Sequence, residues 1–137
     1  MAQKIRKVDY FYIEAANKPG VGLGLLGALR DAGVNLLAFS GFPSGSKAQI
    51  DFIPADSAAF KAAAKKSGFN LSPKKTGFLI QGEDRIGALL GVMGKLAAAR
   101  INVTAIDAVS AGKGRYGAIF WVKAPDVGKA AKILRAS

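Results

Sequence analysis

The sequence predicts an α+β fold made of two copies of one βαββαβ unit. Asn17-Lys18-Pro19-Gly20 is matched by Asp84-Arg85-Ile86-Gly87, and Gly33-Val34-Asn35 is matched by Arg100-Ile101-Asn102, in both cases 67 positions later. A short apolar run precedes each first motif, and a leucine-rich stretch separates the two motifs of each pair. Because a fixed internal period indicates a repeated structural unit, we expect two units, at residues 1–73 and 74–137.

In the first unit, residues 8–15 alternate in the way typical of a strand. Asn17 and Pro19 suit the start of a helix, and Gly33 suits its end. Strands are expected at residues 34–39 and 48–53, a second helix at 58–66, and a short fourth strand at 69–71. The first helix is expected to bury the residues that recur at helical spacing, namely Leu23, Leu26, Ala28, Leu29 and Ala32.

The second unit repeats this order up to its last helix. Strands are expected at residues 77–81, 101–109 and 116–123, and a final helix opens at Pro125-Asp126 and runs through Leu134. No fourth strand follows, and because a bare sheet edge invites pairing, we expect residues 3–8 or a partner chain to cover it. Its first helix is expected over residues 86–100, with a buried stripe of Leu89, Leu90, Met93, Leu96 and Ala97.

The composition excludes several kinds of function. The chain of 137 residues has neither His nor Cys, which removes the usual bases near neutral pH, thiolate metal sites and disulfides. Its nine acidic residues show no pair by spacing, so we expect no catalytic activity, no metal and no cofactor. No apolar run approaches the ~20 residues of a membrane span, so we expect no membrane partner. The absence of Cys fits a cytoplasmic protein.

The net charge of +11 is also informative, because such a surplus attracts nucleic acid, acidic proteins or anionic ligands. The basic residues are dispersed along the chain and not gathered in one run, which favours a protein that is basic without a polyanionic partner. The paired units and the unfinished edge favour a homodimer.

The two loop motifs and two strand entries, in this element order, resemble the ACT domain, and the whole chain resembles the stand-alone tandem ACT proteins. The resemblance covers residues 8–134. It implies two ferredoxin-like units in tandem, with antiparallel sheets and helices on one face. It also implies a regulatory role, in which an amino acid or related small anion is bound and its presence is reported to another protein, such as an unlinked enzyme of amino-acid metabolism.

In the family, effectors sit at the interface of two units and touch the loop between first strand and helix. That loop ends at a helix N-terminus, where free N–H groups favour an α-carboxylate, and Asp84 suits an α-ammonium group. The alternative is that the glycines and asparagines only build tight turns. Carried over by position, the ligand contacts would be Asn17, Lys18, Pro19, Gly20, Val21 and Asn35 in the first unit, and Asp84, Arg85, Ile86, Gly87, Ala88 and Asn102 in the second.

Two other interpretations start from local motifs. The RRM shares the βαββαβ order, and residues 113–120 partly imitate its Gly/aromatic strand, which would make the chain a basic nucleic-acid-binding protein. Here the second aromatic position falls on Ala118, so Tyr116, Phe120 and Trp121 are more simply explained as buried strand residues. The glycines of residues 20–27 lack the dinucleotide-binding spacing, and no acidic residue follows at the ribose position.

Overall fold

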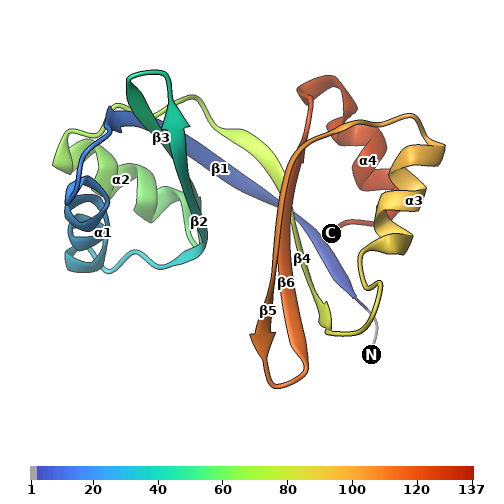
Figure 1. Cartoon of the computed structure of the whole chain (residues 1–137). Helices are drawn as coiled ribbons and strands as arrows, with labels where there is room; N and C mark the ends of the chain where they lie inside the picture. The colour runs from blue at the N-terminus through green and yellow to red at the C-terminus, as the bar shows by residue number, and fades with distance from the viewer. Residues whose placement is uncertain (1–2) are drawn as a thin grey trace. The chain divides into compact units, whose positions relative to one another are not determined.

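The computed structural model describes residues 3–137, which form an α+β structure of antiparallel, ferredoxin-like character (Figure 1). Hydrogen-bonded neighbouring strands follow the order β2-β3-β1-β4-β6-β5. The chain divides into an N-terminal unit, residues 9–75, and a C-terminal unit, residues 3–8 with 76–137. The elements are β1 (Lys4–Ala16), α1 (Val21–Asp31), β2 (Leu36–Ser44), β3 (Lys47–Pro54), α2 (Ser57–Ser67), β4 (Lys75–Glu83), α3 (Leu90–Ala98), β5 (Val103–Gly112), β6 (Arg115–Val122), a 3-10 turn (Ala124–Asp126) and α4 (Val127–Leu134).

The N-terminal unit is built around β3, which pairs antiparallel with β1 on one side and β2 on the other. Phe11 and Phe52 are partners in this register, and the ring of Phe60 from α2 lies 5.3 Å from each of theirs. The expected fourth strand at residues 69–71 is not formed. Ser72 donates its N–H to the Tyr12 carbonyl at 2.9 Å, but Pro73 has no N–H with which to continue a ladder.

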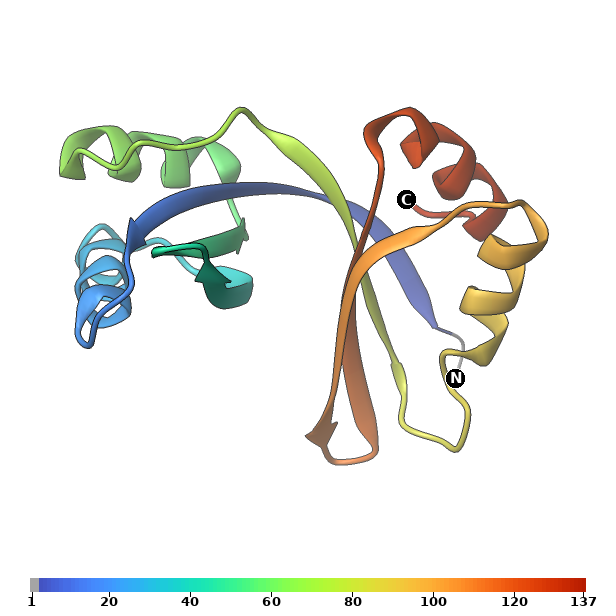
Figure 2. The ribbon, with the colours of Figure 1, turned by 45° about the horizontal axis from the view of Figure 1, so that its top comes forward.

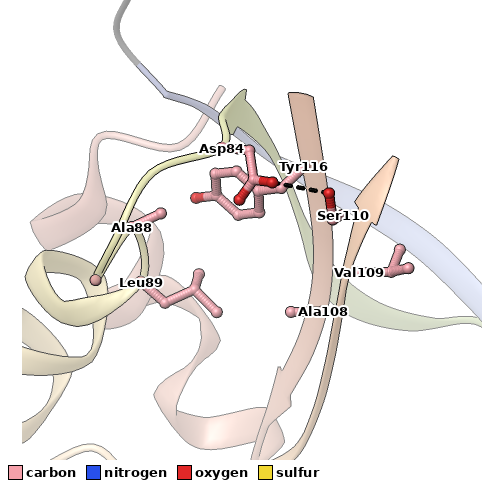
Figure 3. Close-up of a pocket in the computed structure, with 8 residues that line it drawn as sticks. Asp84, Ala88, Leu89, Ala108, Val109, Ser110 and Tyr116 are labelled. Atoms are coloured by element: carbon pink, nitrogen blue, oxygen red, sulfur yellow. Dashed lines mark hydrogen bonds between the residues drawn. The ribbon is translucent and has the colours of Figure 1, made fainter. Parts of the chain in front are cut away.

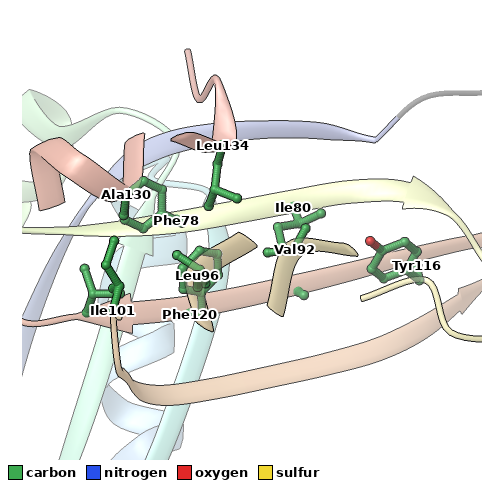
Figure 4. Packing of buried hydrophobic residues seen from close by; sticks show 11 residues of the cluster. Phe78, Ile80, Val92, Leu96, Ile101, Tyr116, Phe120, Ala130 and Leu134 are labelled. Carbon is green, nitrogen blue, oxygen red and sulfur yellow. The ribbon is translucent and has the colours of Figure 1, made fainter. Parts of the chain in front are cut away.

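In the C-terminal unit β6 is the central strand, paired antiparallel with β4 and β5. Phe78 and Phe120 are register partners whose rings stack at 4.9 Å. Helices α3 and α4 lie on the same side of these strands (Figure 2) and cover the face that carries the two rings. They close the core with Val92, Leu96, Ala130 and Leu134 (Figure 4).

Residues 4–8 of β1 cover the free edge of the C-terminal unit, which is one of the two expected alternatives. Strand β1 is the neighbour of β4, and its residues 4–8 belong to this unit, whereas residues 9–16 belong to the other. Ile5 packs against the C-terminal core. Ser137 donates its N–H to the Ile5 carbonyl at 3.1 Å and accepts from the Lys7 N–H at 2.9 Å. The C-terminal unit therefore includes residues that the expected division between residues 73 and 74 assigned to the first unit. This unit contains twelve Lys and Arg residues against four Asp and Glu residues.

The expected buried stripe of α3 is wrong in three of its five residues. The helix begins at Leu90, after a turn over residues 86–89, and buries Val92 and Leu96. Successive helical residues point about 100° apart, so the side that carries Val92 and Leu96 leaves Leu90, Met93 and Ala97 outside. Leu90 is 76% exposed. The expected stripe of α1 is wrong at Leu23, Leu26 and Ala32, which are exposed, Leu23 by 78%. Leu23 is the equivalent of Leu90, so both units show the same apolar face.

All four helices end in a left-handed residue, but the two units use different residues for it. Gly33 and Gly68 follow α1 and α2 with φ of 73° and 77°. Arg100 and Arg135, each 67 positions later, follow α3 and α4 with φ of 58° and 54°. Glycine adopts this conformation freely, whereas other L-residues pay about 1 kcal/mol or more. The C-terminal unit therefore carries strained arginines where its repeat has relaxed glycines.

Candidate functional site

A cavity of about 340 Å³ lies in the C-terminal unit, where the loop from β4 to α3 faces the end of β5 and the start of β6 (Figure 3). Strand register brings these segments together, because Tyr116 pairs with both Gly82 of β4 and Ser110 of β5. We call it the loop cavity. Its lining residues are Asp84, Gly87, Ala88, Leu89, Ala108, Val109, Ser110 and Tyr116.

Among residues 3–137, Asp84 is the only charged residue that lines the loop cavity. Its backbone N–H donates to the Gly114 carbonyl at 2.8 Å, which anchors the residue to the β5–β6 turn. Its carboxylate accepts a hydrogen bond from the Ser110 hydroxyl at 2.7 Å, as the dashed line of Figure 3 shows. One hydroxyl does not satisfy a carboxylate, which accepts several hydrogen bonds. The exposed Asp84 carboxylate therefore retains capacity for a cationic ligand group.

Tyr116 forms the inner wall of the loop cavity and is almost fully buried. The Gln3 side-chain amide donates to both the Tyr116 hydroxyl and the Ala88 carbonyl, so residue 3 joins the wall to the loop. Burial raises the pKa of Tyr116, and nearby Arg85 partly offsets this increase in pKa. Gly82 makes this packing fit, because a Cβ there would lie 2.9 Å from Tyr116 Cε1 and from Gln3 Cγ.

The helices that follow the two candidate loops begin without a side-chain cap. The first residue before α3 is Leu89, and the one before α1 is Gly20, and neither makes a capping hydrogen bond. In contrast, Asp56 caps α2 by accepting from the Ala59 N–H at 3.1 Å. At the start of α3 the Ala88 and Leu90 N–H groups already donate to the Arg85 and Gly87 carbonyls, at 3.1 and 2.9 Å. Only the other N–H groups of such a helix start are available to an anion.

The predicted residues of the second loop are only partly brought together. Asp84, Gly87 and Ala88 line the loop cavity, whereas Arg85 lines a different cavity and Ile86 is fully exposed. Asn102 precedes β5, at the opposite end of the strand from Ser110. At ~3.3 Å per residue this is about 25 Å from the cavity of its own unit.

In the N-terminal unit the equivalent residues make no comparable group. Val21 is half-buried at the start of α1, and the Asn35 carbonyl accepts from the Ala55 N–H at 2.9 Å. A cavity of about 280 Å³ in this unit lies elsewhere, between β1, the start of β3 and residues 70–72. The exposed residues of the loop are Asn17, Lys18, Pro19 and Gly20.

Sequence reasoning missed Ser110 and Tyr116, as well as three apolar lining residues. A usable signal was present, because in a βαββαβ unit the third strand begins beside the end of the first. That geometry places the residues flanking the hairpin turn at 111–114 next to the loop. The apolar residues missed are Leu89, Ala108 and Val109.

The described part of the chain gives little support to metal binding or base stacking. Within residues 3–137 no three acidic side chains lie close enough together to hold a metal ion. Tyr116 and Phe120 belong to the helix-covered core, and Trp121 on the neighbouring position is 6% exposed. The aromatic residues of the RRM-like segment are therefore not displayed for stacking on bases. No helix in the same range has the length and apolar character needed to cross a membrane.

Comparisons with known proteins give a likeness of fold but not of sequence. No protein-family model matches the chain, and no curated protein sequence matches it. Among solved structures, a protein from Bacteroides thetaiotaomicron has a TM-score of 0.79 at 20% identity, covering 96% of this chain and 88% of that one.

Two other structures are described as regulatory parts of aspartate kinase. The regulatory subunit from Thermus thermophilus, in a ligand-free form, has a TM-score of 0.64 at 16% identity and covers 98% of this chain and 96% of that one. A putative C-terminal regulatory domain from Porphyromonas gingivalis has a TM-score of 0.56 at 12% identity and covers 97% and 93%. The chain therefore shares, over nearly its whole length, the fold of regulatory units of aspartate kinase.

Proposed function

We propose that this protein is a non-catalytic sensor that binds an amino acid in the loop cavity and modulates an enzyme or regulator of amino-acid metabolism. One observation carries the proposal: an exposed carboxylate, Asp84, and an uncapped helix start, at Leu89, border the same cavity. A free amino acid has the two complementary charges. The likeness in fold to regulatory subunits of aspartate kinase supports the regulatory part.

The lining of the loop cavity favours an effector with an apolar side chain. Leu89, Ala108 and Val109 supply apolar surface, and the volume of about 340 Å³ is at the small end of the range for ligand sites. The first loop is the weaker candidate, because Asn17 stands where the second loop has Asp84 and cannot neutralise an ammonium group. We therefore propose one principal site per chain, built on Asp84, Gly87 and Ala88.

The experiment is a thermal-shift screen of the twenty amino acids, followed by calorimetric titration of any that stabilise the protein. A ligand at ~100 times its dissociation constant adds ~2.7 kcal/mol if it binds only the folded state. Asp84→Asn preserves shape and an acceptor for Ser110 but removes the charge. An interaction with a charged group contributes ~1.5–3 kcal/mol, so affinity should fall about tenfold or more.

Asp107→Asn is the matched control, because Asp107 is an exposed residue of β5 that does not line the loop cavity. Its affinity should equal that of the wild type. Equal affinity of wild type and Asp84→Asn would place the ligand elsewhere, and a flat response to all amino acids would remove the sensor proposal.

We also propose that a second copy of this chain docks on the exposed apolar faces of α1 and α3. Leu23 and Leu26 on α1 correspond to Leu90 and Met93 on α3, and all four are exposed. Gly27 and Gly94 continue the two stripes, and an added Cβ would meet nothing within 4 Å at either. Small residues beside exposed leucines allow a second helix to approach closely. Matching faces within one chain suit the repeated contacts of a symmetric dimer.

Light scattering after size exclusion tests this dimer. Leu23→Glu with Leu90→Glu should give a monomer. Ile106→Glu is the control, since Ile106 is an exposed apolar residue of edge strand β5 and not of the helices. A monomer produced by Ile106→Glu alone would show that copies pair through strand edges instead.

The regulated partner is proposed to be an unlinked enzyme in the cytoplasm. The chain has no cysteine and forms no disulfide, so its folding does not require an oxidising compartment. Regulation requires that the effector bind two states with different affinity. Capture of a partner with and without the effector should therefore show different yields, and equal yields would contradict a regulatory role.

A further inference from the structure

A second cavity in the C-terminal unit, of about 320 Å³, has a different chemical character from the loop cavity. Three cationic residues from three separate segments border it: Arg85 from the loop, Lys95 from α3, and Arg135 at the end of α4. None of its lining residues is acidic. We call it the basic cavity.

The three cations are not neutralised by the protein itself. Within residues 3–137 none of them forms an ion pair with a carboxylate. Arg85, Lys95 and Arg135 are exposed, so water and salt screen their mutual repulsion, and a bound anion reduces that repulsion further. The surrounding unit adds to the attraction, since β1 brings Lys4, Arg6 and Lys7 into it.

Helix α3 also contributes small and apolar residues to the lining of the basic cavity. Gly91 and Val92 of α3 line the basic cavity, and a Cβ added at Gly91 would meet no atom within 4 Å. A volume of about 320 Å³ is at the small end of the range for ligand sites, so it suits a compact molecule.

From this arrangement we infer that the basic cavity binds a small phosphorylated molecule, with Arg85, Lys95 and Arg135 on its phosphate oxygens. A single carboxylate carries one negative charge and is matched by one arginine. Three cationic residues around one cavity are matched better by a phosphate monoester or pyrophosphate, whose oxygens accept from two guanidinium groups at once. The site is separate from the proposed amino-acid site, although Ala88 lines both cavities.

The helix ends provide an unusually well-matched pair of variants. Arg135→Gly removes one cation from the basic cavity but places a glycine at φ of 54°, where glycine is unstrained. Arg100→Gly makes the same chemical change at φ of 58°, after α3, and Arg100 does not line the basic cavity. Both variants lose one positive charge from the same unit, so non-specific attraction is lowered equally.

The test is a calorimetric titration with pyrophosphate at constant ionic strength. Wild type and Arg100→Gly should bind with the same affinity, and Arg135→Gly should bind about tenfold more weakly or worse, as should Lys95→Gln. Thermal denaturation of each variant shows that the fold is retained. Failure of the wild type to bind pyrophosphate would overturn the inference.

Equal weakening in Arg100→Gly and Arg135→Gly would also overturn it, because that result means diffuse attraction to a basic surface. A single-stranded RNA oligomer is titrated in parallel. If RNA binds tightly and pyrophosphate does not, the cations serve a polyanion and the small-molecule site is wrong. Loss of the amino-acid response in Asp84→Asn with pyrophosphate binding intact would separate the two sites.

Discussion

Gly82→Ala should destabilise the C-terminal unit through a single methyl group. The new Cβ would lie 2.9 Å from both Gln3 Cγ and Tyr116 Cε1, whereas carbon atoms pack at ~3.5–4.0 Å. Tyr116 is held between strands and Gln3 is held by two hydrogen bonds, so neither can move by the required ~0.6 Å or more without loss. Overpacking of this kind costs about 1–3 kcal/mol, which lowers the melting temperature by about 4–8 °C per kcal/mol in a unit of this size.

Thermal denaturation followed by circular dichroism measures the effect, and Gly24→Ala is the matched control. Gly24 lies inside α1, and a Cβ there would meet no atom within 4 Å. The same glycine-to-alanine change should therefore stabilise by ~0.5–1 kcal/mol through helix propensity. A Gly82→Ala protein as stable as the wild type would refute the packing of Gln3 and Tyr116 against β4.

Three further predictions concern titration, a helix cap and the core. Burial raises the pKa of Tyr10 and Tyr116, so their contribution to stability should be complete below about pH 10 and fall as pH rises through the folded pKa. In an absorbance titration Tyr116→Phe should remove a phenol that ionises late, and loss of an early one would contradict the burial. Asp56→Ala should cost ~1 kcal/mol of unfolding free energy in denaturant by freeing the Ala59 N–H, with no change if the cap does not form in solution. Phe120→Ala should cost ~3–5 kcal/mol in the same assay, because the ring is fully buried and stacked, and a loss below ~1 kcal/mol would argue against this core.

The sequence period predicted the fold because each repeated motif marks a change of element. The motif at residues 17–20 and its repeat at 84–87 each separate a strand from a helix. Each helix ends at a left-handed residue, a glycine in the first unit and an arginine 67 positions later in the second. What the pattern could not give was the rotation of α3 about its axis. Its apolar residues are spread around more than one face, so only tertiary packing decides that Val92 is buried and Leu90 exposed.

The sequence predicted the residues of the candidate site that lie in the loop, but not those that strand pairing brings to it. Asp84 and Gly87 follow from the motif alone. Ser110 and Tyr116 reach the same cavity through pairing across β6, which local spacing does not specify. Gln3 was harder still, because 85 residues separate it from the Ala88 carbonyl that it contacts.

The shared use of β1 has a consequence during synthesis of the chain. Residues 9–75 are contiguous, so the N-terminal unit has all its segments as soon as Lys75 leaves the ribosome. Residues 4–8 are synthesised before the N-terminal unit but have no partner strand until β4 and the residues after it emerge. At ~5–20 residues per second, roughly 60 further residues take about 3–12 s. This unpaired segment carries three positive charges, on Lys4, Arg6 and Lys7. Charged side chains on an unpaired strand disfavour its pairing with a neighbouring nascent chain before its own sheet has formed.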